Sequence, residues 1–83
     1  MAKFYFDMRN ISGFDRDEVG DDFDSFDEAR TQAQSLLPDI AREELPDGDM
    51  HSVVCDVRDE TGRVVYRGEI TYRGTPDPDQ HQG

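Results

Sequence analysis

The sequence has no tryptophan, a single cysteine and no long hydrophobic run. One cysteine cannot form a disulfide within the chain, which agrees with a reducing compartment. No segment approaches the length of a membrane span, and the N-terminal residues lack the apolar core of a secretory signal. These absences predict a cytoplasmic protein without a membrane-spanning helix.

Basic residues are also scarce. The chain has 9 Lys and Arg against 20 Asp and Glu, a net charge of −11 and a pI near 4.3. Affinity for nucleic acid comes largely from Lys and Arg side chains that neutralise phosphates, and anionic membranes attract the same side chains. We therefore expect no direct binding to nucleic acid or to a membrane surface, whereas basic proteins and cations remain possible partners.

The length of 83 residues corresponds to one domain, close to the lower size at which a core holds without disulfides or a metal. Hydrophobic content is only 34%, but the apolar residues fall into periodic segments, which disordered chains lack. We predict a single domain over residues 1–73. The remainder, residues 74–83, reads GTPDPDQHQG and is predicted to be a disordered tail.

The first strand is predicted from the alternating sequence KFYFDMR, residues 3–9. One side would carry Phe4, Phe6 and Met8, and the other Tyr5, Asp7 and Arg9. Asn10, Ser12 and Gly13 supply turn residues. A short second strand at residues 21–23 could form a hairpin with the first.

A helix is predicted over residues 26–45. Ser25 and Glu28 fit a capping box, in which the Ser hydroxyl accepts from the Glu28 amide and the Glu carboxylate from the Ser25 amide. Pro38 lies off the apolar stripe, so we expect one helix kinked near Leu37, or alternatively two abutting helices. Pro46, Asp47 and Gly48 would end it. The stripe comprises Phe26, Ala29, Ala33, Leu36, Leu37, Ile40 and Ala41.

The last third of the sequence predicts two antiparallel strands around the turn at residues 59–62. Buried positions are odd-numbered on the first strand and even-numbered on the second, so a two- or four-residue loop would pair Val57 with Val64. A three-residue loop would instead turn Arg67 and Glu69 into the core. Gly68 suggests a bulge or bend. The two- or four-residue loop would also place Cys55 opposite Tyr66. The predicted buried positions are Val53, Cys55 and Val57 on the first strand and Val64, Tyr66, Ile70 and Tyr72 on the second.

The fold class is therefore α+β, with a small antiparallel sheet of three to four strands in β(β)αββ order and one amphipathic helix on one face. The other face is predicted to be solvated, with cross-strand ion pairs. A docking or homodimerisation surface is the alternative. That face would display Tyr5, Asp7, Arg9, Val54, Asp56, Arg58, Val65, Arg67, Glu69, Thr71 and Arg73.

The acidic stretch GFDRDEVGDDFDSFDE, residues 13–28, invites comparison with a calcium-binding EF-hand loop. Asp15, Asp17 and Gly20 match that pattern. Val19 and Phe26 occupy two positions that need oxygen ligands, and a strand rather than a helix precedes the loop. We expect no specific metal site, with weak divalent-cation binding through residues 15–24 as an alternative.

The acids of this stretch divide by position. Asp24, Asp27 and Glu28 lie at the helix N-terminus, where the helix dipole favours carboxylates. The remaining acids exceed what the architecture requires. We predict that they form a partner-facing acidic patch, which comprises Asp15, Asp17, Glu18, Asp21 and Asp22.

Residues typical of catalysis do not form a recognisable constellation. No carboxylate pair is evidently shielded from water, as an acid–base pair at neutral pH requires. His51 and His81 lack metal-ligand neighbours at zinc spacing. Cys55 lies on the buried side of its strand and is interpreted as a small hydrophobe rather than a reactive thiol. We expect no enzyme activity, no cofactor and no catalytic residues.

Three segments, FYFDMRN, DEVGDDFDSFDEAR and VRDETGRVVYR, together resemble a family of short bacterial proteins, common in alphaproteobacteria, that is classed as a domain of unknown function. The likeness covers about residues 3–73. It implies a cytoplasmic bacterial β(β)αββ domain and no active residues. Val19 within the acidic stretch and Pro38 within the helix depart from the family's pattern.

The start of the helix, DSFDEA, is similar to that of HicB-like antitoxins. This resemblance implies an acidic partner of a basic toxin, although the long hairpin after the helix fits it poorly. Together, these observations predict a non-enzymatic protein-interaction module with an unidentified and possibly basic partner. The antitoxin role and weak cation binding are the alternatives.

Overall fold

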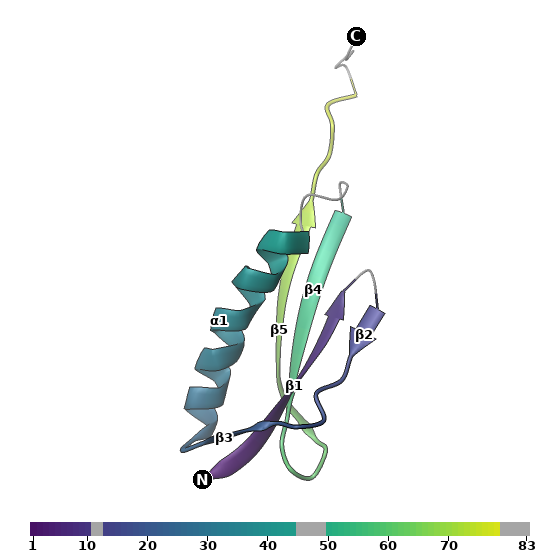
Figure 1. Cartoon of the computed structure of the whole chain (residues 1–83). Coiled ribbons are helices and arrows are strands. Elements are labelled where there is room, and N and C mark those ends of the chain that lie inside the picture. The colour runs from purple at the N-terminus through teal and green to yellow at the C-terminus, as the bar shows by residue number, and fades with distance from the viewer. Residues whose placement is uncertain (11–12, 45–49, 79–83) are drawn as a thin grey trace.

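The computed structural model describes residues 1–10, 13–44 and 50–78 (Figure 1). Within these ranges the sheet has five antiparallel strands, ordered β2-β1-β4-β5 with β3 also paired to β1. The predicted α+β class is confirmed; β2 was not predicted. The elements are β1 (Ala2–Asn10), β2 (Gly13–Asp15), β3 (Asp21–Phe23), α1 (Phe26–Glu44), β4 (Met50–Arg58) and β5 (Val64–Arg73).

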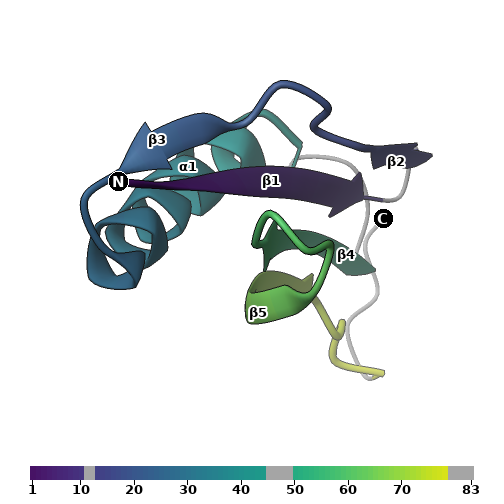
Figure 2. The ribbon, with the colours of Figure 1, turned by 90° about the horizontal axis from the view of Figure 1, so that it is seen from below.

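β2 and β3 share one edge of β1, and β4 lies along the other edge (Figure 2). β3 pairs with the start of β1, where Ala2 is opposite Phe23, as the predicted hairpin required. β2 pairs with the end of β1, where Asn10 is opposite Gly13. The connection over residues 16–20 therefore runs beside the middle of β1, where neither short strand reaches.

The helix α1 packs on one face of β4 and β5 and runs without interruption through Pro38 (Figure 1). The single-helix prediction is correct, and the alternative of two helices is wrong. Pro38 is exposed, so water can replace the backbone bond that it removes. The predicted end at residues 46–48 lies outside the described residues. On the apolar stripe Ala29, Ala33, Leu37 and Ala41 are buried, Leu36 and Ile40 are half-buried, and Phe26 is exposed.

The helix start differs from the predicted capping box in one bond. The Ser25 hydroxyl accepts from the Glu28 amide at 3.3 Å, as expected. The Glu28 carboxylate, however, accepts from the amide of Asp24 at 3.0 Å rather than from that of Ser25. The carboxylate thus reaches one residue further back, and both side chains still satisfy amides at the start of the helix.

Close approach between the helix and the sheet depends on Gly68. A Cβ atom at this position would lie 2.6 Å from Cδ1 of Leu37, well inside van der Waals contact. Of the predicted bulge or bend, the bulge is wrong at Gly68, because the register shift of β4 and β5 lies at Val57 and Arg58. The glycine makes room for a helix side chain. The buried apolar residues around this contact are Phe4, Phe6, Ala29, Ala33, Leu37, Ala41, Val53, Cys55 and Val57.

The β4–β5 turn has a three-residue loop, closed by a bond from the Asp59 amide to the Arg63 carbonyl at 2.9 Å. Gly62 has φ +90°, a conformation that favours glycine. Arg58 is opposite Val64, and a register shift next to this pair then places Val57 opposite Tyr66.

Without this shift, a three-residue loop would pair the odd-numbered buried positions of β4 with odd-numbered positions of β5. The shift pairs them with even-numbered positions instead. Arg67 consequently stays on the side away from the helix, opposite Asp56. The predicted pairing of Val57 with Val64 is wrong by two residues. Cys55 likewise pairs with Gly68 rather than Tyr66. The bulge also exchanges two valines, because Val65 packs against the core whereas Val64 is 46% exposed.

Candidate functional site

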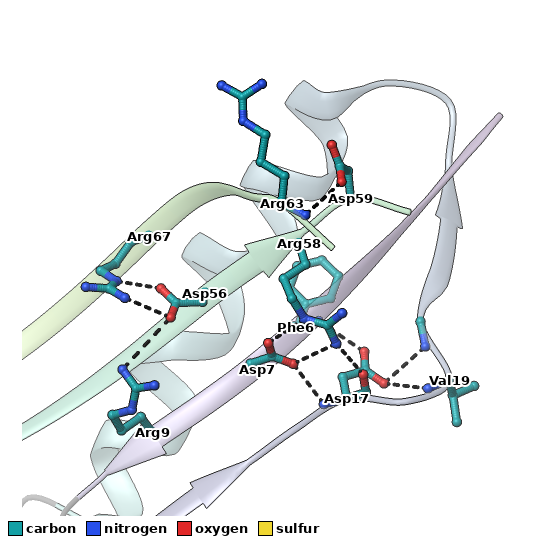
Figure 3. A network of polar contacts seen from close by, with 11 residues as sticks. Phe6, Asp7, Arg9, Asp17, Val19, Asp56, Arg58, Asp59, Arg63 and Arg67 are labelled. Carbon is teal, nitrogen blue, oxygen red and sulfur yellow. Dashed lines mark hydrogen bonds and ion pairs between the residues drawn. The ribbon is translucent and has the colours of Figure 1, made fainter. Parts of the chain in front are cut away.

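The face of the sheet away from the helix carries a network of carboxylates and guanidinium groups (Figure 3). Asp7 on β1 lies directly opposite Asp56 on β4. Like charges in this position repel, so each carboxylate needs a cation. Arg58 donates to both oxygens of Asp7, from Nε at 2.6 Å and from Nη2 at 3.1 Å. Arg67 binds Asp56 with the same bidentate geometry, donating from Nε at 2.5 Å and from Nη2 at 3.0 Å.

Asp17 fastens the acidic connection to this network. Its own amide donates to Asp7 Oδ1 at 3.0 Å, and its carbonyl accepts from Arg58 Nη2 at 2.8 Å. Its carboxylate accepts from the amide of Phe6 through Oδ2 at 3.1 Å. That bond satisfies an amide on the β2 and β3 edge of β1, in the interval that neither of these two short strands covers.

The same carboxylate also shapes the turn that follows. Asp17 Oδ1 accepts from the amides of Val19 and Gly20, both at 3.0 Å. Gly20 has φ +72°, and a Cβ atom there would lie 2.8 Å from the ring of Tyr5. The Tyr5 ring also contacts the guanidinium of Arg58, with 4.9 Å from Cζ to the ring centroid. Gly20 therefore meets both a conformational and a steric requirement.

This arrangement corrects the prediction of a solvated sheet face in part, since Arg9, Arg67, Glu69, Thr71 and Arg73 are exposed as predicted. The cross-strand ion pairs are present, but Asp7, Asp56 and Arg58 are buried, with exposed fractions of 5%, 6% and 8%. Residues 16–20 fold onto this side of β1 through Asp17 and Gly20 and cover Asp7 and Arg58. Asp56 instead lies against the side chains of Arg67 and Arg9. Ion pairs on an open strand surface contribute little, whereas a pair removed from water depends strongly on both partners.

The pKa values reflect these contacts. Burial alone would raise the pKa of Asp7, but the hydrogen bonds from Arg58 and from the Asp17 amide hold it below its ordinary range. For Asp17, burial again acts upward, and the bonds from the amides of Gly20, Phe6 and Val19 lower the pKa. The hydrogen bond to Asp7 raises the pKa of Arg58. All three groups are therefore charged at neutral pH.

The predicted acidic patch separates into two kinds of residue. Asp17 is half-buried, and both its carboxylate oxygens are hydrogen-bonded inside the protein. The other four residues are exposed, and none of their carboxylates makes a hydrogen bond or ion pair with the described part of the chain. They are Asp15 on β2, Glu18 in the connection, and Asp21 and Asp22 on β3.

A shallow depression of about 320 Å³ opens between residues 16–18 and the β4–β5 turn. Arg58 and Tyr5 contribute to its lining, together with side chains of both charges, so it favours neither anions nor cations. The complete lining is Tyr5, Arg16, Asp17, Glu18, Arg58, Glu60, Thr61 and Gly62.

The cysteine and one of the two histidines lie in the core. Cys55 is fully buried, and burial, with the charges of Asp56 and Asp7, raises the pKa of its thiol to about 11. The interpretation of Cys55 as a core residue is confirmed. His51 is also buried, and His81 lies outside the described residues. Among the residues that the structure describes, no three His, Cys, Asp or Glu side chains converge as metal ligands.

These features define a small α+β domain in which one helix covers one face of an antiparallel sheet and a buried ion-pair network lies on the other. The chain belongs to the family DUF6894, a domain of unknown function whose family model matches residues 3–71. The resemblance to such a family is thereby confirmed, without a test of bacterial origin. No curated protein and no solved structure matches the chain. In the described ranges no helix has the length and apolarity to cross a membrane.

Sequence reasoning missed the network formed by Asp7, Asp17 and Arg58. Strand alternation did place Asp7 and Arg58 on the same face, and their opposite charges were a usable signal. The missing information was the path of residues 16–20, because a polar connection has no hydrophobic period that would fix its course.

Proposed function

We propose that this domain is a non-enzymatic protein-interaction module that binds a basic partner through the exposed carboxylates of Asp15, Glu18, Asp21 and Asp22. The observation that carries the proposal is the contrast within one segment. The Asp17 carboxylate is fully engaged by the protein's own amides, whereas the carboxylates of these four acids are exposed and make no hydrogen bond or ion pair with the described residues.

An ordered support makes such a surface suitable for recognition. The segment is held at both ends by strand pairing, with Met8 opposite Asp15 and Phe4 opposite Asp21. Asp17 and Gly20 hold its middle. Charged groups on a preformed surface lose less conformational entropy on binding than groups on a flexible chain, and they steer oppositely charged partners during encounter.

The narrower antitoxin-type role is one form of this proposal, since it also requires a basic partner. Weak divalent-cation binding is a separate alternative that would use the same exposed carboxylates. Asp17 is a poor cation ligand, because coordination would compete with the amide bonds that shape the turn.

The test is affinity capture from a native cell lysate with three purified proteins. The first is the wild type, and the second carries Asp15→Asn, Glu18→Gln, Asp21→Asn and Asp22→Asn. The third is a matched control with an equal change in charge elsewhere. It carries Asp27→Asn, Asp39→Asn, Glu43→Gln and Asp77→Asn.

We expect a basic protein to be retained by the wild type and the control but not by the patch variant, with retention that weakens as salt rises. Equal retention by all three proteins, or no retention by the wild type at low salt, would contradict the proposal. A calcium titration followed by amide NMR tests the alternative. Saturable shifts confined to residues 15–24 at sub-millimolar calcium would favour cation binding instead.

A further inference from the structure

The strand β5 forms an uncovered edge of the sheet. It pairs with β4 on one side, and no described strand lies along its other side (Figure 1). It is ten residues long, whereas β2 and β3, which line the opposite edge, have three residues each. An open edge of this length presents a row of backbone donors and acceptors to another strand.

The side chains of β5 make this edge complementary to itself. When two identical strands pair antiparallel around a two-fold axis, the residue at the axis faces its own copy, and residues at equal distances on either side face each other. With the axis at Gly68, Arg67 of one chain lies opposite Glu69 of the other, and symmetry produces this pair twice. On the helix side, Tyr66 lies opposite Ile70, a favourable aromatic and β-branched pair.

Neighbouring registers are disfavoured by charge. An axis at residue 67 places Arg67 opposite itself, and an axis at residue 69 places Glu69 opposite itself. An axis at residue 70 places Arg67 opposite Arg73. Like charges directly opposite on adjacent strands are destabilising, so only the axis at Gly68 among these four registers satisfies both central charges.

Both charged side chains have capacity for the additional bond. Arg67 is 57% exposed and uses Nε and Nη2 for Asp56, and within the described residues Nη1 makes no hydrogen bond. Glu69 is exposed and accepts from the Thr71 hydroxyl through Oε2, which leaves Oε1 without a hydrogen bond to the same part of the chain. Gly68 has no side chain to obstruct the axis.

We propose that β5 pairs with β5 of a second copy of this chain, antiparallel and centred on Gly68, to form a continuous sheet across a symmetric dimer. The Arg67–Glu69 pairs set the register, and the two helices lie on the same side of the joined sheet. This interface is separate from the acidic patch, so either proposal can fail without the other.

Sedimentation velocity over a hundredfold concentration range tests the dimer with the wild type and two variants. Glu69→Arg replaces both cross-chain attractions with repulsions. Within the described residues Glu69 makes no salt bridge, although its charge acts on the nearby Arg67. Glu43→Arg, on the exposed surface of α1, is the control with the same change in charge. We expect a concentration-dependent dimer for the wild type and the control, and at least about tenfold weaker association for Glu69→Arg.

Spin-label distances test the register. A label at Thr71→Cys is selective, because the native Cys55 is buried with a raised thiol pKa. At about 3.4 Å per residue, an axis at Gly68 places the two Cα atoms of residue 71 about 20 Å apart, and each shift of the axis by one residue changes this by about 7 Å. A wild type that stays monomeric, equal association of Glu69→Arg, or a distance that indicates another axis would overturn the proposal.

Discussion

The apolar core on the helix side of the sheet and the Asp7–Arg58 pair on the opposite face are both buried, but by different interactions. On the helix side, Ala33 and Val53 are fully buried in a close-packed apolar core. On the other side, Asp7 and Arg58 are almost as deeply buried, and their charges are compensated by each other and by hydrogen bonds with Asp17. The first face depends on shape and volume. The second depends on complete pairing, because a charge left without its counterion there would be largely removed from water.

The largest effect is expected from Arg58→Ala, which leaves the Asp7 carboxylate buried without its cation. Since a single connection covers the pair and solvent screens part of its field, we expect a loss of about 2 to 4 kcal/mol in the free energy of unfolding. Chemical denaturation measures it. The double variant Asp7→Leu with Arg58→Met should lose less than Arg58→Ala alone; an equal or larger loss would show that charge pairing is not what this face requires.

The apolar face is tested by Leu37→Ala, with an expected loss of about 2 to 3 kcal/mol from the methyl groups removed and the cavity left. Gly68→Ala should also destabilise the wild type, because its new methyl group would overlap Cδ1 of Leu37. In the Leu37→Ala background the same change should cost much less. Strict additivity in this double-mutant cycle, measured by denaturation, would contradict the proposed contact.

The polar face should also give the domain a characteristic acid sensitivity. The pKa values of Asp7 and Asp17 are lower in the folded state than in the unfolded chain, so their ionised forms stabilise the fold. This contribution is complete above the unfolded pKa of about 3.9 and is lost as pH falls through the lower folded values. In acid titrations followed by circular dichroism, Asp17→Asn should show a shallower loss of stability below about pH 4. Asp15→Asn, a matched exposed control, should follow the wild type.

A smaller effect is expected at the helix start, where neither face is involved. Ser25→Ala removes the hydroxyl that accepts from the Glu28 amide and should cost about 0.5 to 1 kcal/mol. Ser25→Asp keeps an acceptor and should restore most of the loss in the same denaturation measurement. If both variants behave alike, the capping bond contributes nothing measurable.

The apolar face could be predicted from the sequence, because periodicity reports directly on burial against a helix. The pattern identified the buried alanines of α1 and the alternation of β1 and β4. It did not give the β4–β5 register, since the bulge beside Val57 changes the pairing without changing which face is apolar. Alternation along a strand shows which residues share a face. The register between two strands also depends on the geometry of the turn that joins them.

The polar face could be predicted only in part. The ion pairs followed from strand alternation, but their burial depends on Asp17, one acid among many similar neighbours. Its distinguishing feature is its position opposite an unpaired interval of β1, which becomes visible only when β2 and β3 are both placed. For the same reason, composition alone could not separate the structural acid from the four exposed acids.

The distinction between Asp17, which supports the fold, and the four exposed acids is tested most directly by the free energies of unfolding of five single variants under identical conditions. They are Asp15→Asn, Asp17→Asn, Glu18→Gln, Asp21→Asn and Asp22→Asn. We predict that Asp17→Asn alone is destabilising, by about 1 to 2 kcal/mol, because an amide cannot accept through both of its terminal atoms. The other four should be neutral or slightly stabilising, since each lowers an excess of negative charge. An Asp17→Asn loss no larger than that of its neighbours would contradict the account.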